Sequence, residues 1–280
     1  MAKILVVGLG GIGYRVASIL HCRGHRVIGL KRRLPEFVAD FPVVVADICR
    51  PETLSSLDTD FDLVLFCVAP VTRTPEAYQA LYFQGLNHLL LHFAASESRP
   101  KWLMVSSTSV YSHNHGEWVD ETSPADSDSA TARWLVAAEQ RLWFDSQQHC
   151  VVRFAGIYGP GRDWLLRRAA RGEQIQRQPP TYSNRIHADD CVGVLLLLAE
   201  QQLASAPIQS CYLACDDDPA PLWDVIAWLA ERHGFAAPQA LVAAEDAPRN
   251  KRCDNGRLKQ LGYRFIYPSY RDGYAALAAA

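Results

Sequence analysis

The chain has 280 residues, a net charge of −2 and a hydrophobic fraction of 49%, values that exclude a disordered or collagen-like polymer. Near-neutral charge argues against a surface built for nucleic acid or an anionic membrane. No apolar run approaches the ~18 residues that cross a bilayer, so we expect a soluble, cytoplasmic protein. The basic residues are unevenly distributed, because only five are lysines and none of these lies between residues 102 and 250.

Strands and helices are predicted to alternate along the first half of the chain. Apolar and β-branched runs predict strands at residues 3–7, 25–30, 43–46, 63–68, 102–106 and 151–154. Helices are predicted at residues 14–22, 75–96 and 131–147. This alternation is typical of βαβ units and indicates an α/β fold, a doubly wound parallel sheet with both faces covered.

The first predicted strand runs into a glycine-rich turn, Gly8-Leu9-Gly10-Gly11-Ile12-Gly13, which matches the dinucleotide pattern G-x-G-x-x-G. Gly8 permits the tight turn, Gly10 lets the backbone approach a pyrophosphate, and Gly13 lets the helix pack on the sheet. The helix N-terminus then offers free N–H groups to the phosphates. We therefore predict a cofactor site that includes Gly8, Gly10, Gly11, Ile12 and Gly13.

The second predicted strand ends in Leu30-Lys31-Arg32-Arg33, where NAD-binding chains usually have an acidic residue for the ribose 2′-hydroxyl. A carboxylate would repel a 2′-phosphate, whereas Lys31, Arg32 and Arg33 would pair with it. The sequence thus favours NADP over NAD, with a solvated basic loop as the alternative interpretation. Ala69, after the fourth predicted strand, is also assigned to the cofactor site.

Four further segments resemble the extended short-chain dehydrogenases of the NAD-dependent epimerase/dehydratase family. They are Val105 to Tyr111, which is similar to SS-x-x-VYG; Arg153 to Arg162, similar to LR-x-x-x-IYGPGR; Asn184 to Asp190, similar to R-x-IHVDD; and the terminal region from Asn255 to Tyr274. The resemblance implies a Rossmann domain (1–153 plus about 186–215) and a small discontinuous substrate domain (about 154–185 plus 216–280). It also implies that Ser107 hydrogen-bonds the substrate oxygen. A strand-end serine that caps the backbone is the alternative for Ser107.

The sequence departs from the family at its general acid. Family members carry a tyrosine followed four residues later by a lysine, and alignment on Ala138-Glu139-Gln140 puts Thr131 and Leu135 at these positions. No tyrosine lies between Tyr111 and Tyr158 to take over the role. The missing pair is typical of the atypical subgroup of the family, and its loss would cost about 10²–10⁴-fold in rate if nothing replaced it.

Three residues are candidates on the substrate side. Histidine is the side chain best suited to proton transfer near neutral pH, which makes His113 a candidate replacement acid, although a polar surface loop is the alternative. The resemblance gives Tyr111 a packing or substrate-contact role. Arg185 would either hold an anionic substrate group or form a salt bridge. No metal site is expected.

Two functional hypotheses remain open. The first is an NADP(H)-dependent oxidoreductase or epimerase/dehydratase-like enzyme that acts on a small-molecule carbonyl or alcohol. The second is a dinucleotide-binding sensor or scaffold without turnover. The family resemblance implies a homodimer through the helices at 75–96 and 131–147. Neither nucleic acid nor a membrane is expected as a partner.

Overall fold

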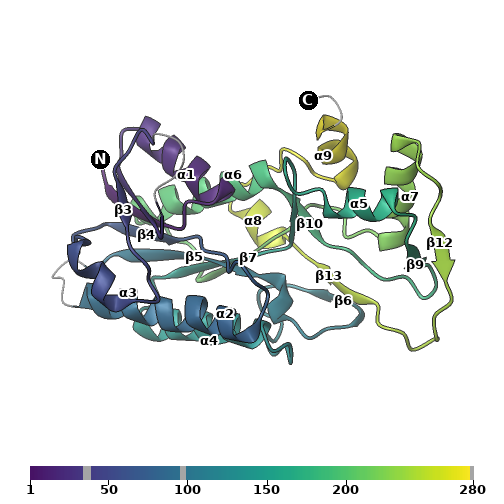
Figure 1. Cartoon of the computed structure of the whole chain (residues 1–280), viewed down its shortest axis with the longest axis horizontal. Helices are drawn as coiled ribbons and strands as arrows, with labels where there is room; N and C mark the ends of the chain where they lie inside the picture. Colours follow the sequence, from purple (N-terminus) through teal and green to yellow (C-terminus); the bar gives the residue numbers. More distant parts are fainter. Residues whose placement is uncertain (34–38, 95–98, 278–280) are drawn as a thin grey trace. The chain divides into compact units, whose positions relative to one another are not determined.

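The computed structural model describes residues 1–33, 39–94 and 99–277 of the chain. Its main sheet has seven strands in the order β11-β7-β5-β4-β1-β2-β3 (Figure 1). In chain order these are β1 (Lys3–Val7), β2 (Arg26–Lys31), β3 (Val43–Val45), β4 (Leu63–Phe66), β5 (Lys101–Ser107), β7 (Cys150–Phe154) and β11 (Cys211–Ala214). β1 is parallel to β2 and β4, β2 to β3, and β4 to β5. The predicted Rossmann-type α/β class is confirmed.

Helices cover both faces of this sheet, so its central strands are apolar on both sides. β1 is buried from Ile4 onward, and every residue of β4 is buried. Figure 1 shows α1 (Gly11–Cys22) and α6 (Ala188–Leu203) on one face. On the other face lie α2 (Pro75–Tyr78), α3 (Leu86–Ala94) and α4 (Ala132–Asp145). Short 3₁₀ turns occur at Pro51–Ser56 (η1) and Thr108–Val110 (η3).

The helix predicted at residues 75–96 is not a single α-helix. A π-helical segment, η2 (Gln79–Gly85), separates α2 from α3. The apolar periodicity that predicts a helix does not distinguish the wider π-turn, because the segment remains helical throughout. Residues 95 and 96 of the prediction lie outside the described residues.

The chain divides into two compact units. Unit 1 comprises residues 1–110, 125–153 and 192–212, and unit 2 comprises residues 111–124, 154–191 and 213–280. Residues 111–124, about 186–191 and about 213–215, which the sequence assigns to the first domain, cluster with the second unit in the structure. One of the boundaries, between residues 191 and 192, falls within α6.

Unit 2 is built from three two-stranded parallel ladders and several helices. The ladders pair β6 (His115–Val119) with β13 (Asn250–Cys253), β8 (Gly156–Tyr158) with β10 (Arg185–His187), and β9 (Gln174–Gln176) with β12 (Gln239–Leu241). The helices are α5 (Trp164–Ala170), α7 (Leu222–His233), α8 (Gly256–Gln260) and α9 (Tyr270–Leu277). Its core includes Tyr158, Leu165, Ile175, Ile226, Leu229, Tyr270 and Tyr274.

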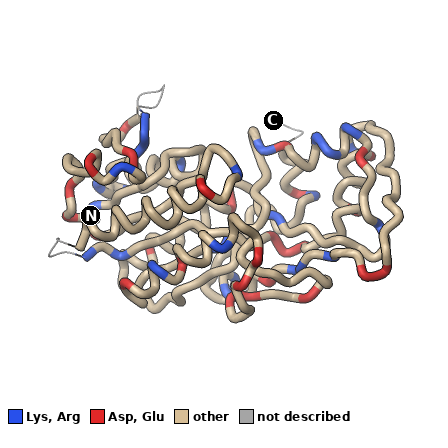
Figure 2. Tube along the Cα trace, turned by 60° about the horizontal axis from the view of Figure 1, so that its bottom comes forward, with Lys and Arg blue, Asp and Glu red and all other residues tan. Residues whose placement is uncertain are grey.

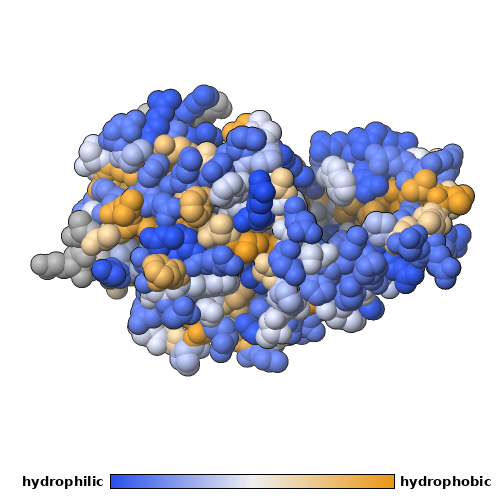
Figure 3. Space-filling view, turned by 90° about the horizontal axis from the view of Figure 1, so that it is seen from below, coloured by the Kyte–Doolittle hydropathy of each residue, from blue (hydrophilic) through white to orange (hydrophobic). Residues whose placement is uncertain are grey.

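Charged residues of both signs are interspersed along the described trace (Figure 2). Figure 3 shows apolar side chains interrupting the polar surface on the face of unit 1 that carries α3 and α4. Two of the exposed apolar residues lie on these helices, Leu91 and Phe144, the latter 88% exposed. Within the described residues no helix combines the length and apolar character needed to cross a membrane.

Candidate functional site

The glycine turn between β1 and α1 has the backbone that a pyrophosphate loop requires. Gly8 has a φ of +96°, and a Cβ at this position would lie 2.4 Å from the carbonyl oxygen of Cys67. A Cβ at Gly13 would lie 2.1 Å from the carbonyl oxygen of Gly8. Neither position accepts a side chain, so the segment after β4 and the start of α1 pack directly against the turn.

The outer side of this turn is open. A Cβ at Gly10 or Gly11 would meet no described atom within 4 Å. α1 begins at Gly11 with Gly10 as its N-cap, and among the described side chains none accepts a hydrogen bond at this cap. The first N–H groups of α1 therefore remain available, and the helix dipole adds positive potential. Gly10, Gly11, Ile12 and Gly13 fit the pyrophosphate of a dinucleotide.

Basic residues gather at the end of β2. Lys31 is half-buried, Arg32 and Arg33 are exposed, and residues 26–33 include no acidic residue. Burial, followed by the Asp47 carboxylate, raises the pKa of the Cys49 thiol, and the Arg32 guanidinium opposes this shift. Arg32 therefore lies within electrostatic reach of the segment after β3, at the sheet edge where the adenosine ribose of a dinucleotide sits in this fold.

The segment after β4 lies on the other side of the glycine turn, because β4 and β2 flank β1. Ala69 is exposed there. The neighbouring carbonyl of Val68 accepts a hydrogen bond from the hydroxyl of Tyr82 at 3.0 Å. Neither a motif nor a spacing marks Tyr82 in the sequence.

Ser107 ends β5 and is half-buried. Its Oγ accepts the N–H of Ser109 at 3.1 Å, which is the backbone-capping arrangement, and its hydroxyl hydrogen remains available to donate. The preceding residue belongs to a buried network. Ser106 donates to Glu139 at 2.5 Å, and the Arg153 guanidinium pairs with the same carboxylate at 2.6 Å. This network anchors the end of β5 to α4 and β7.

Thr131 and Leu135 occupy the start of α4. Thr131 is the N-cap residue, and its hydroxyl lies 3.1 Å from that of Ser129. Leu135 is 2% exposed and belongs to the apolar core. Neither side chain can donate or accept a proton near neutral pH, so this part of α4 supplies packing and no acid–base group.

Tyr111 and His113 belong to unit 2, together with a lysine that the sequence analysis did not assign. Tyr111 is 2% exposed, and its ring lies 6.4 Å from that of His113, centroid to centroid. Among the described residues Nδ1 of His113 has no hydrogen-bond partner. The ammonium of Lys251 donates to the carbonyl of Tyr111 at 3.2 Å, and burial lowers its pKa. Lys251 is the first lysine after the long gap, a signal that could have identified it.

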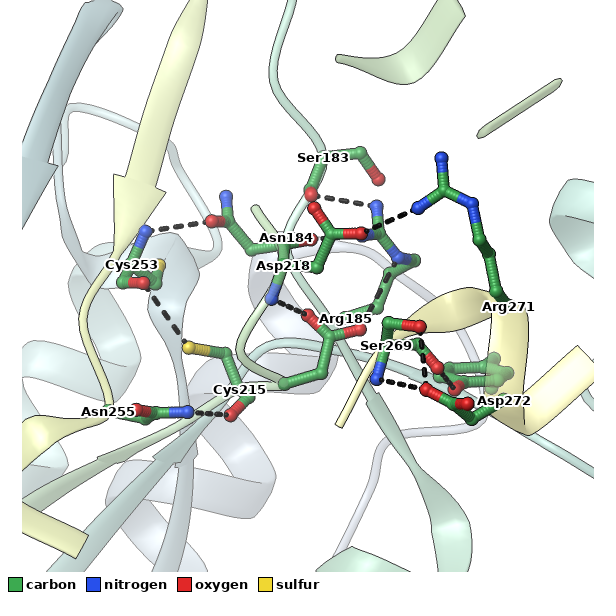
Figure 4. Close-up of polar contacts among 12 residues, drawn as sticks. Ser183, Asn184, Arg185, Cys215, Asp218, Cys253, Asn255, Ser269, Arg271 and Asp272 are labelled. Atoms are coloured by element: carbon green, nitrogen blue, oxygen red, sulfur yellow. Dashed lines mark hydrogen bonds and ion pairs between the residues drawn. The ribbon is translucent and has the colours of Figure 1, made fainter. Parts of the chain in front are cut away.

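Arg185 is buried, and its guanidinium is engaged by partners within unit 2 (Figure 4). It donates to the carbonyls of Ser183 at 2.7 Å and Asp218 at 2.5 Å. Arg185 was expected either to hold a substrate anion or to form a salt bridge. Its Nε lies 3.6 Å from the Asp216 carboxylate, which corresponds to the salt bridge. Burial raises the pKa of Asp216 to about 7 in spite of this cation. An internal role for Arg185 accounts for these contacts without a substrate.

The candidate residues are therefore divided between the two units. Unit 1 holds the glycine turn, the basic end of β2, Ala69 and Ser107, and unit 2 holds Tyr111, His113 and Arg185. A pocket of about 390 Å³ lies elsewhere in unit 1, beside Lys101, His149 and Gln202. Lys101 and His149 precede the body of β5 and β7, so this pocket is at the amino-terminal edge of the sheet, whereas ligands of such sheets bind at the carboxyl edge. Among the described residues no group of three or more His, Cys, Asp or Glu could hold a metal ion.

The fold and the glycine turn define a dinucleotide-binding α/β protein. A model of the NAD dependent epimerase/dehydratase family matches residues 4–208, and the chain belongs to this family. The resemblance found in the sequence motifs is thereby confirmed.

Known proteins align along nearly the whole chain. Protein YeeZ of Escherichia coli (strain K12) is 27% identical over 282 residues, which cover 96% of this chain and 97% of YeeZ. A solved protein from Methylobacillus flagellatus is 34% identical, with a TM-score of 0.82 over 99% of this chain and 98% of that one. A short-chain dehydrogenase/reductase superfamily protein from Agrobacterium tumefaciens, solved with bound NAD, is 18% identical with a TM-score of 0.79 over 99% and 96% of the chains. At 18% identity the likeness concerns the fold alone.

Proposed function

We propose that this protein is an NADP(H)-dependent oxidoreductase or epimerase/dehydratase-like enzyme of the atypical extended short-chain dehydrogenase group. The observation that carries the proposal is the open glycine turn beside the basic end of β2, where Lys31, Arg32 and Arg33 follow one another. Three cations pair with a 2′-phosphate, whereas a 2′-hydroxyl calls for a carboxylate. This favours NADP(H), although the Agrobacterium tumefaciens protein of the same fold holds NAD.

The substrate is a carbonyl or alcohol compound. The bound nicotinamide supplies the hydride donor or acceptor. Ser107 donates its hydroxyl hydrogen to the substrate oxygen, and the N–H of Ser109 holds the serine Oγ in place. A water molecule or His113 provides the proton in place of the tyrosine–lysine pair. Of the two roles considered for Tyr111, its exposure of 2% favours packing over a substrate contact.

A sensor or scaffold that binds the dinucleotide without turnover is the second candidate. The observation that favours it is the apolar, fully packed Leu135 at the position of the family's lysine, with Thr131 at that of the tyrosine. In this case Ser107 serves only to cap the backbone after β5.

Two measurements on the purified protein test these proposals, the first the cofactor and the second the choice between enzyme and sensor. The first compares the Kd of NADPH with that of NADH by isothermal titration calorimetry, and tighter binding of NADH would refute the cofactor assignment. The second follows NADPH absorbance against aldehydes, ketones and sugar nucleotides. We expect turnover that falls at least tenfold in Ser107→Ala, and no turnover with any compound would favour the sensor.

We also propose that copies of the chain pair through α3 and α4, where Leu91 and Phe144 are exposed. Light scattering after size-exclusion chromatography should give twice the monomer mass for the wild type and the monomer mass for Phe144→Glu. A monomeric wild type at micromolar concentration would refute this pairing.

A further inference from the structure

The π-helical segment η2 is the most unusual backbone feature of unit 1. It extends over seven residues between two α-helices, whereas π-helices are rare and mostly limited to a single turn. Such segments occur frequently at functional sites because they redirect side chains out of the α-helical register. The four segments that resemble the family do not include η2, and the contacts of η2 indicate what it does.

One side of η2 packs against the segment that follows β3. The thiol of Cys49 donates to the carbonyl of Ala80 at 3.3 Å. A Cβ at Gly85 would lie 2.7 Å from Cγ1 of Ile48, so the glycine lets the backbone of η2 approach the Ile48 side chain very closely. His88, one turn further on, has its Nδ1 2.8 Å from the carbonyl oxygen of Ile48. These contacts fix the π-helix relative to the β2–β3 side of the sheet.

Tyr82 connects η2 to the other side of the glycine turn. Its side chain is 7% exposed, and its hydroxyl donates to the carbonyl of Val68. Burial, with smaller contributions from Tyr78 and Cys67, raises the pKa of the Tyr82 phenol, so the hydroxyl stays protonated and remains a donor. The carbonyl of Cys67 in turn packs so closely against Gly8 that it leaves no room for a Cβ there. One hydrogen bond thus links the π-helix to the backbone directly beside the glycine turn.

The strand order assigns this backbone to one half of the cofactor. A dinucleotide lies across the point where the strand order reverses, with its pyrophosphate on the turn after β1. The end of β2 recognises the adenosine ribose. β4 lies on the opposite side of β1, so we infer that residues 67–69 would border the nicotinamide half of a bound cofactor.

We propose that Tyr82 is a positioning residue for the nicotinamide half of the bound cofactor, acting through the carbonyl of Val68. Its hydrogen bond holds the backbone of residues 67–69 in the conformation that binds the cofactor. Without the hydroxyl, the backbone of residues 67–69 gains conformational freedom. This freedom must be lost when the cofactor binds, which lowers the affinity. The inference rests on the proposed NADP(H) binding and adds to it the residue that orders one end of the site.

Tyr82→Phe removes the hydroxyl and keeps the ring. Calorimetry should compare two ligands, NADPH and 2′-phospho-ADP-ribose, the second of which lacks the nicotinamide. We expect NADPH to bind threefold to tenfold more weakly to the variant, as the loss of one hydrogen bond implies, and 2′-phospho-ADP-ribose to bind unchanged. Tyr82→Met, which also lacks the hydroxyl, provides the same comparison if the phenylalanine variant does not fold.

Tyr263→Phe is the matched control, because it removes a tyrosine hydroxyl that donates to Asp190 at 2.9 Å within unit 2. It should change the affinity for neither ligand. Equal affinities of wild type and Tyr82→Phe for NADPH would overturn the inference, and so would an equal loss for both ligands, which would indicate a general structural role. A wild type that binds neither ligand would refute the proposed function, and this inference with it.

Discussion

The buried ion pair between Glu139 and Arg153 allows a quantitative test of what holds β5 in place. Glu139 is 1% exposed and Arg153 is 3% exposed, and the carboxylate also accepts the hydroxyl of Ser106. Glu139→Gln keeps the shape of the side chain but leaves the guanidinium buried without a counter-charge. Breaking a buried pair in this way costs about 3–5 kcal/mol, because the remaining charge is no longer compensated.

This loss in the free energy of unfolding corresponds to a large decrease in the unfolding temperature. A protein of this size loses roughly 2–4 °C in Tm per kcal/mol, so Glu139→Gln should lower the unfolding temperature of unit 1 by roughly 6–20 °C. Differential scanning calorimetry measures this change. Asp163→Asn is the control, since its ion pair with Arg167 is exposed and should contribute at most about 1 kcal/mol.

A change of less than 2 °C in Glu139→Gln would refute this reasoning. A second variant tests the cause of the loss. Glu139→Leu combined with Arg153→Met replaces both charges by apolar side chains, and such replacements of buried pairs are often neutral. The double variant should therefore be more stable than Glu139→Gln alone, and equal or greater destabilisation would contradict the electrostatic explanation.

Three other predictions concern the cofactor site and the pH dependence. Gly13→Ala adds a Cβ 2.1 Å from a backbone oxygen of the turn, so it should weaken NADPH binding at least 100-fold in calorimetry, and an unchanged Kd would contradict the assigned geometry. Replacement of Lys31, Arg32 and Arg33 by alanine should weaken NADPH binding at least tenfold and change NADH binding by less than twofold, whereas an equal loss for both would contradict 2′-phosphate recognition. Burial raises the pKa of Asp216 to about 7, so its stabilising contribution is complete below about pH 4 and is lost as the pH rises towards 7. The difference in Tm between wild type and Asp216→Asn should accordingly decrease over this range, and a constant difference would refute the pKa assignment.

The alternating strands and helices were predictable because burial on both faces leaves long apolar runs. The π-helix was not, since α- and π-helical segments share a similar apolar pattern. The role of Arg185 stayed open at the sequence level because both alternatives use the same side chain. Its buried contacts with the Asp216 carboxylate and the Asp218 carbonyl depend on a segment distant in sequence.

The sequence by itself determined the family and the cofactor turn, because local patterns encode both: consecutive glycines, a basic strand end and motifs in the order of the family. It also predicts that the tyrosine–lysine pair is absent, since no lysine lies between residues 102 and 250. Only the tertiary structure decided which polar groups meet, among them Tyr82 with Val68, Lys251 with Tyr111, and Glu139 with Arg153. The physical reason is that a hydrogen bond or ion pair depends on distance in space, and the packing of helices on the sheet brings together residues that are far apart in the chain.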